Sequence, residues 1–135
     1  MTNLSQKRIF VVEDDLNNRI ITQMALVPYD VRIEFDRWGT DTLSNLLNFG
    51  RPDIIILDLM FPNGITGYDI FDMIRADKAY AHVPIIAMSA SDAATSIPRC
   101  QEKGFNGFIA KPIDSDQFPA QIEKILNGQS IWQGR

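Results

Sequence analysis

The sequence is poor in the residues that build disulfide scaffolds, metal clusters and membrane spans. Cys100 is its only cysteine and His82 its only histidine, which excludes an internal disulfide and a metal centre built from Cys or His. Apolar runs such as Ile54–Leu57 are far too short to cross a bilayer. The start, residues 1–7, is polar and does not resemble a secretory signal. We therefore expect a cytoplasmic protein with no membrane insertion.

Basic residues are fewer than acidic ones. The chain has 13 Lys and Arg against 17 Asp and Glu, which gives a net charge of −4 and a sequence pI of about 4.8. Nucleic-acid binding proteins present a basic face, and no run of Lys and Arg could form one here. We expect no direct contact with nucleic acid.

The length and apolar content suit one domain. With 135 residues, of which 45% are hydrophobic, the chain can bury one continuous core. We predict a single domain over residues 1–135, with its core at about 7–127. Nine residues remain after Leu126, so we expect a short C-terminal tail and no second domain.

Short β-rich runs alternate with segments of helical spacing along the whole chain. The predicted strands are 9–12, 31–35, 53–58, 83–88 and 107–110. The predicted helices are 16–26, 40–49, 68–75, 91–103 and 117–126, of which the fourth is expected to be short or to start late, because Pro98 fits best at a first helical position. Parallel strands joined by helices predict an α/β fold with a doubly wound five-stranded parallel sheet, flavodoxin-like, in the order 2-1-3-4-5 with five helices.

Polar residues follow four of these strands. In an open parallel sheet, the carboxyl ends of the central strands form the site, and the residues found there are Glu13, Asp14, Asp15, Asp58, Ser89 and Lys111. Crowded carboxylates need a countercharge, and Mg²⁺ suits a site with one or two carboxylates, waters and phosphate oxygens. One carboxylate can then attack phosphorus, while Lys111 and Ser89 stabilise the charge that develops.

Each residue also has a simpler interpretation. An acid after a strand is often a helix N-cap, which fits Asp14 or Asp15 taken alone. Ser89 alone would be a turn residue, Lys111 alone a solvated charge, and Phe108 a core residue. Asp58 differs, because an acid at the end of the most buried strand needs a compensating role.

The combined motifs resemble the receiver domains of bacterial two-component response regulators. The matching segments are Val11-Val12-Glu13-Asp14-Asp15, Leu57-Asp58-Leu59-Met60-Phe61-Pro62, Met88-Ser89-Ala90 and Ala110-Lys111-Pro112. The resemblance covers essentially the whole chain, in order. A second, slighter resemblance, to receivers of phosphorelays, is carried by Asn17-Asn18-Arg19.

The resemblance implies a role for each matching position. Asp58 would be the phosphoacceptor, and Lys111 would pair with the phosphoryl group. The Mg²⁺ ligands would be Asp14, Asp58 and the backbone carbonyl of Met60, with Glu13 acting mainly through water. Ser89 and Phe108 would be the switch residues. The Lys111–Pro112 bond would be cis.

The resemblance also implies a function and partners. The chain would be a stand-alone switch that accepts a phosphoryl group from a sensor histidine kinase or a histidine phosphotransfer protein and then binds a downstream protein target. It would be no enzyme beyond catalysing its own phosphorylation and dephosphorylation. The resemblance also allows a homodimer that forms through the face of the fourth helix, fifth strand and fifth helix.

Two features depart from the family, and two other functions stay open. The loop 62–67 is one residue longer than usual, and Pro98 falls where the family runs an unbroken helix. The alternatives are a pseudo-receiver that docks without phosphorylation and a flavin- or nucleotide-binding module on the same sheet. An Asp-based phosphohydrolase usually carries a second acid two residues after its nucleophile, where this chain has Met60.

Overall fold

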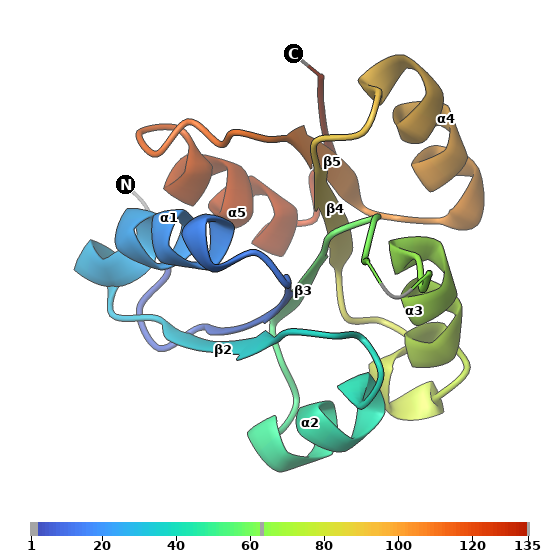
Figure 1. Ribbon diagram of the computed structural model, residues 1–135. Helices are drawn as coiled ribbons and strands as arrows, with labels where there is room; N and C mark the ends of the chain where they lie inside the picture. The colour runs from blue at the N-terminus through green and yellow to red at the C-terminus, as the bar shows by residue number, and fades with distance from the viewer. Residues whose placement is uncertain (1–2, 63, 135) are drawn as a thin grey trace.

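A parallel β-sheet with helices on both faces forms the protein (Figure 1). The computed structural model describes residues 3–62 and 64–134. The strands are β1 (Arg8–Val12), β2 (Arg32–Asp36), β3 (Ile54–Leu57), β4 (Ile85–Ser89), β5 (Gly107–Ala110) and β6 (Ile131–Gln133). The helices are α1 (Leu16–Leu26), α2 (Thr42–Phe49), α3 (Gly67–Arg75), α4 (Ala93–Lys103) and α5 (Phe118–Leu126), with short 3-10 turns at Val27–Tyr29 and Lys78–Tyr80.

The strand order is β2-β1-β3-β4-β5-β6, and every neighbouring pair is parallel. The predicted fold and the order 2-1-3-4-5 are confirmed for the first five strands. The sixth strand was not predicted. It lies in the expected C-terminal tail and pairs with the outer edge of β5, so that Phe108 is in register with Trp132.

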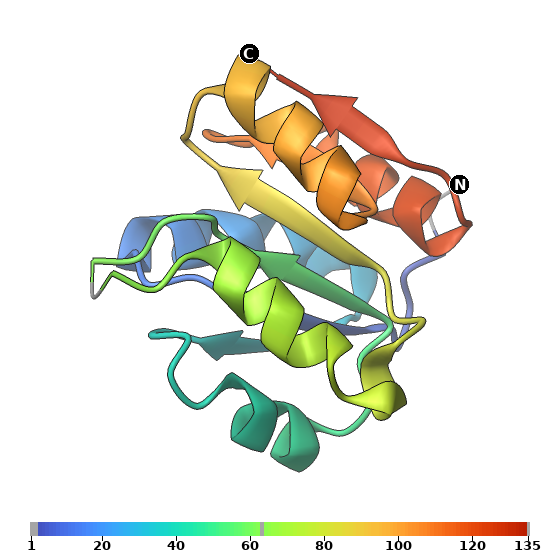
Figure 2. The same ribbon diagram turned by 90° about the vertical axis from the view of Figure 1, so that its right-hand side faces the viewer.

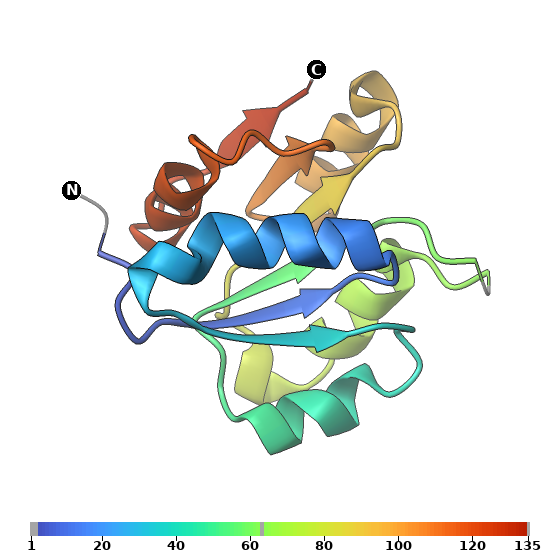
Figure 3. The ribbon, with the colours of Figure 1, turned by 60° about the vertical axis from the view of Figure 1, so that its left-hand side comes forward.

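Each face of the sheet has its own hydrophobic cluster. Helices α2, α3 and α4 cover one face of the sheet (Figure 2), and α1 and α5 cover the other (Figure 3). Along β3, Ile55 and Leu57 contribute to the cluster beneath α2, α3 and α4, whereas Ile54 and Ile56 contribute to the cluster beneath α1 and α5. All four side chains are completely buried. Burying each such side chain contributes about 1.5–3 kcal/mol, and covering on both faces explains why the strand has no polar position.

Helix α4 corrects one expectation. It runs for 11 residues from Ala93 to Lys103 and includes Pro98 in its interior. The side chain of Asp92 caps its first turn by accepting from the Ala94 N–H, and Gly104 ends it in the left-handed conformation. Because Pro98 has no N–H, the Ala94 carbonyl lacks its usual donor four residues later. Capping at both ends and packing on the sheet outweigh this local loss.

The apolar stripe of α1 points to solvent. Leu16, Ile20, Met24 and Val27, at the helical spacing noted in the sequence, are between 45% and 69% exposed. The buried side of the helix instead includes Arg19, Thr22, Ala25 and Leu26. A helix normally buries its apolar stripe, so this stripe is a surface available for contact with another molecule.

Candidate functional site

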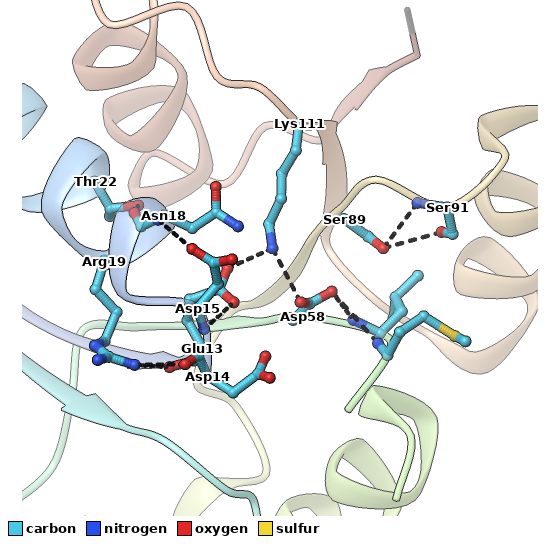
Figure 4. A network of polar contacts seen from close by, with 12 residues as sticks. Glu13, Asp14, Asp15, Asn18, Arg19, Thr22, Asp58, Ser89, Ser91 and Lys111 are labelled. Carbon is cyan, nitrogen blue, oxygen red and sulfur yellow. Dashed lines mark hydrogen bonds and ion pairs between the residues drawn. The ribbon is translucent and has the colours of Figure 1, made fainter. Parts of the chain in front are cut away.

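The predicted site residues converge on one cleft at the carboxyl ends of the strands (Figure 4). The cleft has a volume of about 460 Å³. Its lining residues come from the ends of β1, β3, β4 and β5 and from the start of α1; they are Asp14, Asp15, Asn18, Asp58, Met60, Ser89, Ala90, Ser91 and Lys111. Glu13 lies beneath this lining and is completely buried.

The side chain of Lys111 crosses the base of the cleft. Its Nζ donates to Oδ2 of Asp58 at 2.9 Å and also forms an ion pair with Glu13. Burial by itself would lower the pKa of Lys111, but the charges of Asp58 and Glu13 outweigh burial and raise it. Lys111 is therefore a permanent cation at the point where negative charge gathers.

The carboxylate of Asp58 is held on two sides. Its Oδ1 accepts from the backbone N–H of Leu59 at 2.7 Å and, more weakly, from that of Met60 at 3.4 Å, while Oδ2 faces Lys111. Backbone donors need no side-chain ordering, so they fix the carboxylate at little entropic cost. Asp58 is 9% exposed, and its open side faces the cleft.

The acid cluster fits a divalent cation. Glu13, Asp14 and Asp58 each have one carboxylate oxygen within 4.8 Å of the other two. Against these three negative groups, the described lining of the cleft contains one cation, Lys111. Burial raises the pKa of Glu13, and the charge of Asp58 adds to the rise, while Lys111 acts to lower it. Carboxylate oxygens with an open side are ligands that Mg²⁺ accepts.

Arg19 supports the acidic loop, a role that the sequence analysis did not assign to it. Its buried guanidinium reaches back from α1, and Nη1 donates to the carbonyls of Glu13 at 3.2 Å and Asp14 at 2.8 Å (Figure 4). These bonds satisfy two backbone acceptors in the turn between β1 and α1. The sequence analysis noted Arg19 only as part of Asn17-Asn18-Arg19, because these contacts depend on how the turn folds.

Ser89 bonds to the next loop rather than to Asp58. Its Oγ donates to Ser91 Oγ at 3.0 Å and accepts from the Ser91 N–H at 3.1 Å, and Ser91 Oγ lies 2.8 Å from Ser96 Oγ in α4. Three hydroxyl groups thus join the rim of the cleft to α4. Ser91 and Ser96 had no motif of their own and were missed.

The structure also places the remaining predicted positions, although the switch role of Phe108 stays a prediction. Phe108 is completely buried and belongs to the hydrophobic cluster beneath α4. The Lys111–Pro112 bond is cis, as expected. Met60 lines the cleft and its side chain is exposed, while the metal role of its carbonyl stays a prediction. The long loop is closed by an antiparallel bridge between Met60 and Thr66.

Comparison with protein families gives a match over most of the chain. A family model described as the response regulator receiver domain matches residues 9–123. The chain belongs to this family. As a receiver domain it is part of two-component signalling, in which receiver domains are switches rather than conventional enzymes.

Known relatives of this receiver domain come from several kingdoms. The two-component response regulator ORR12 of rice is 27% identical over 92% of this chain and 98% of its own length. The chemotaxis protein CheY of Pseudomonas aeruginosa is 32% identical over 65% of this chain and 69% of its own. The resemblance to response regulators is confirmed, but its restriction to bacterial ones is not.

Solved structures give the same fold. The HemR receiver domain of Leptospira biflexa superposes with a TM-score of 0.77 at 27% identity, covering 90% of this chain and 94% of that one. The phosphorylated cyanobacterial phytochrome response regulator RcpA gives 0.74 at 26% identity, covering 90% and 91%. CheY4 of Vibrio cholerae, at 19% identity, gives 0.79, covering 90% and 99%, and supports the fold alone.

Some relatives are much longer than this receiver domain. The chain spans 12% of the probable histidine kinase 5 of rice, at 26% identity, and 51% of the regulator ARR3 of Arabidopsis thaliana, at 30% identity. Receiver domains therefore occur within larger proteins as well as in short ones. Among the described residues, no helix combines the length and the apolar character needed to cross a membrane.

Proposed function

We propose that Asp58 accepts a phosphoryl group from a phosphohistidine in a Mg²⁺-dependent reaction, and that this modification switches a protein-binding face. The observation that carries the proposal is the arrangement around Asp58. Its carboxylate opens into the cleft, has Lys111 Nζ at 2.9 Å, and shares a metal-sized cluster with Glu13 and Asp14. An aspartyl nucleophile needs this combination of access and nearby positive charge.

The proposed step is an in-line transfer. A carboxylate oxygen of Asp58 forms a bond to phosphorus, the bond from phosphorus to the imidazole nitrogen breaks, and that nitrogen keeps the electron pair. Lys111 pairs with the phosphoryl oxygens, and the Leu59 N–H holds the other oxygen of Asp58 in place. Asp14, Glu13 and Asp58 would hold the Mg²⁺, which would neutralise charge on the transferring group when bound.

The exposed stripe of α1 supports a protein as the phosphodonor. Leu16, Ile20 and Met24 face solvent on the helix whose first turn borders the cleft through Asn18. An apolar helix face beside the acceptor suits a helical partner, such as the domain of a sensor histidine kinase or phosphotransfer protein that carries the phosphohistidine. We further propose that a sensor kinase or phosphotransfer protein is the donor and that a downstream protein is the target. We also propose that the chain is cytoplasmic and forms a single domain over residues 1–135.

The cleft favours the phosphoacceptor over the two alternatives. A flavin or nucleotide phosphate would meet Asp14, Asp15 and Asp58, and Lys111 is already paired with two carboxylates. An unphosphorylated docking module would have no need for a buried acid cluster, which is costly to maintain. No observation favours either alternative over the phosphoacceptor function.

The test is chemical labelling of the acceptor. The wild-type chain and Asp58→Asn are incubated with acetyl phosphate and Mg²⁺, and the intact mass is measured. We expect one added phosphoryl group on the wild type, none on Asp58→Asn, and none on the wild type in EDTA. Asp116→Asn, an exposed acid outside the cleft, is the matched control and should label normally. Labelling of Asp58→Asn would overturn the proposal.

A further inference from the structure

The sixth strand occupies an edge that a five-stranded sheet would leave open. Strand β6 runs parallel to β5 (Figure 3). In register, Gly107 lies opposite Ile131 and Ile109 opposite Gln133. The approach is close: a Cβ added to Gly107 would lie 2.7 Å from the Ile131 carbonyl oxygen. The chain thus covers the β5 edge with its own C-terminal segment.

This segment contacts the elements on both sides of β5. Trp132 packs on the cluster that contains Phe108, and Ile97 of α4 packs on the same cluster. Gly134 lies against α4, because a Cβ there would be 2.9 Å from that of Ala93. Gln133 bonds to Gln121 of α5. The face formed by α4, β5 and α5 is therefore covered by β6.

The attachment of β6 is weak. The strand has three residues, and Ile131 and Trp132 are only half-buried. Short edge strands with little buried area open at low free energy. The segment leaves α5 through Gly128, whose φ of 89° gives a turn that few other residues adopt. Opening at this turn would not disturb the other strands.

A chain of contacts joins β6 to the cleft. Ser89, at the rim, bonds to Ser91, and Ser91 bonds to Ser96 of α4. One turn of α4 around Ser96 carries Ala93 and Ile97, which lie beside Gly134 directly after β6. Pro98 removes one backbone bond from this helix and makes it easier to deform. Hydroxyl bonds and the packing of α4 thus connect Ser89 to the C-terminal segment.

We propose that the β5 edge is a strand-docking surface that β6 occupies at rest and leaves when Asp58 is phosphorylated. The inference rests on the proposed function. A phosphoryl group offers new acceptors to the Ser89 hydroxyl, so Ser89 gives up its bond to Ser91 and α4 shifts away from Gly134. The freed edge then fits an extended partner segment with an aromatic side chain in the place of Trp132.

The first experiment observes β6 in the full chain. In Trp38→Phe, Trp132 is the only tryptophan. Its emission and acrylamide quenching are recorded with Mg²⁺, before and after acetyl phosphate, while intact mass reports phosphorylation. We expect a red shift and stronger quenching in the phosphorylated chain. Unchanged quenching in a chain shown to be phosphorylated would overturn the release of β6. A chain that accepts no phosphoryl group would overturn the proposed function, and the release with it.

The second experiment tests the docking surface without phosphorylation. A fluorescein-labelled peptide of residues 128–134 is titrated against full-length Trp132→Asp, whose own β6 cannot bury a charged side chain beside Phe108. We expect the peptide to bind this variant, and to bind the wild type only after phosphorylation. Trp132→Ala is the milder second variant, and a peptide with Ala at the Trp position is the control. No binding to either folded variant would overturn the docking surface.

Discussion

The Nζ atom of Lys111 lies 2.9 Å from Oδ2 of Asp58, although the strands that precede them are not neighbours. Asp58 follows β3, Lys111 follows β5, and β4 runs between them. The same ammonium also pairs with Glu13 after β1. One buried cation therefore links the ends of three strands, and it does so at the position where the proposed phosphoryl group would be attached.

Replacing Lys111 by Met is expected to destabilise the protein when no metal is present. The change leaves the buried carboxylates of Glu13 and Asp58 without their cation, which costs about 3–5 kcal/mol. Mg²⁺ should restore part of the loss by neutralising the same groups. Urea unfolding in EDTA and in Mg²⁺ measures both effects. Equal stability of the variant and wild type in EDTA would contradict this view.

The control for that variant is Lys103→Met. Lys103 pairs with Asp72, whose side chain is 64% exposed. Such a solvent-exposed ion pair is worth at most about 1 kcal/mol. We expect a small effect that does not depend on Mg²⁺.

Arg19→Met is expected to weaken both folding and metal binding. It leaves the carbonyls of Glu13 and Asp14 without the donor that holds them, which costs about 1–3 kcal/mol. The loosened turn should bind Mg²⁺ less tightly, as calorimetric titration would show. Arg37→Met, at an exposed position, should change neither quantity. Unaltered Mg²⁺ affinity in Arg19→Met would show that the turn is held by other contacts.

The candidate site could be predicted from the sequence because it follows from strand topology. Glu13, Asp14, Asp58, Ser89 and Lys111 each lie at the carboxyl end of a recognisable strand or within two residues after it, and the ends of parallel strands meet at one edge. No knowledge of side-chain packing was needed. The clustering of these residues is confirmed by the structure, while their chemical roles remain predictions.

The features that were missed depend on contacts between distant segments. Strand β6 has too few residues to show a pattern, and it forms only because β5 offers an edge and Trp132 can pack beside Phe108. The interior Pro98 of α4 was read by its local preference, which packing and capping outweigh. Arg19 belongs to the segment that resembles phosphorelay receivers, but its bonds to the carbonyls of Glu13 and Asp14 exist only once the turn before α1 has folded.

Gly67→Ala is expected to disturb Asp58 through its backbone. A Cβ at Gly67 would lie 2.1 Å from the carbonyl oxygen of Asp58 and 2.9 Å from the Leu59 Cα. The backbone at the acceptor must therefore shift, and overpacking of this kind costs about 1–3 kcal/mol. We expect slower labelling by acetyl phosphate together with lower stability in urea.

Gly64→Ala is the matched control in the same loop. A Cβ at Gly64 would meet nothing within 4 Å, but its φ of 83° makes alanine unfavourable there by about 1–2 kcal/mol. It should lose stability while labelling at the wild-type rate. If both variants label equally slowly, general loosening of the loop rather than contact with Asp58 is the cause.

Cys100 gives a prediction for the pH dependence of stability. Burial raises the pKa of its thiol above the usual 9.0, while a hydrogen bond with Tyr68 and the charge of Arg99 lower it by less. The folded state thus holds this proton more tightly than the unfolded chain does. The contribution to stability is complete below pH 9.0 and is lost as the pH rises towards the folded value.

We therefore expect the free energy of unfolding to fall above pH 9.0, with a slope from this thiol of at most about 1.4 kcal/mol per pH unit. Cys100→Ala should show a shallower decline, and Tyr68, whose pKa burial also raises from 10.0, should account for part of the remainder. The thiol is completely buried, so a disulfide reagent should modify it only as the protein unfolds in urea. Rapid modification of the folded chain at neutral pH would mean that α4 opens far more often than its packing suggests.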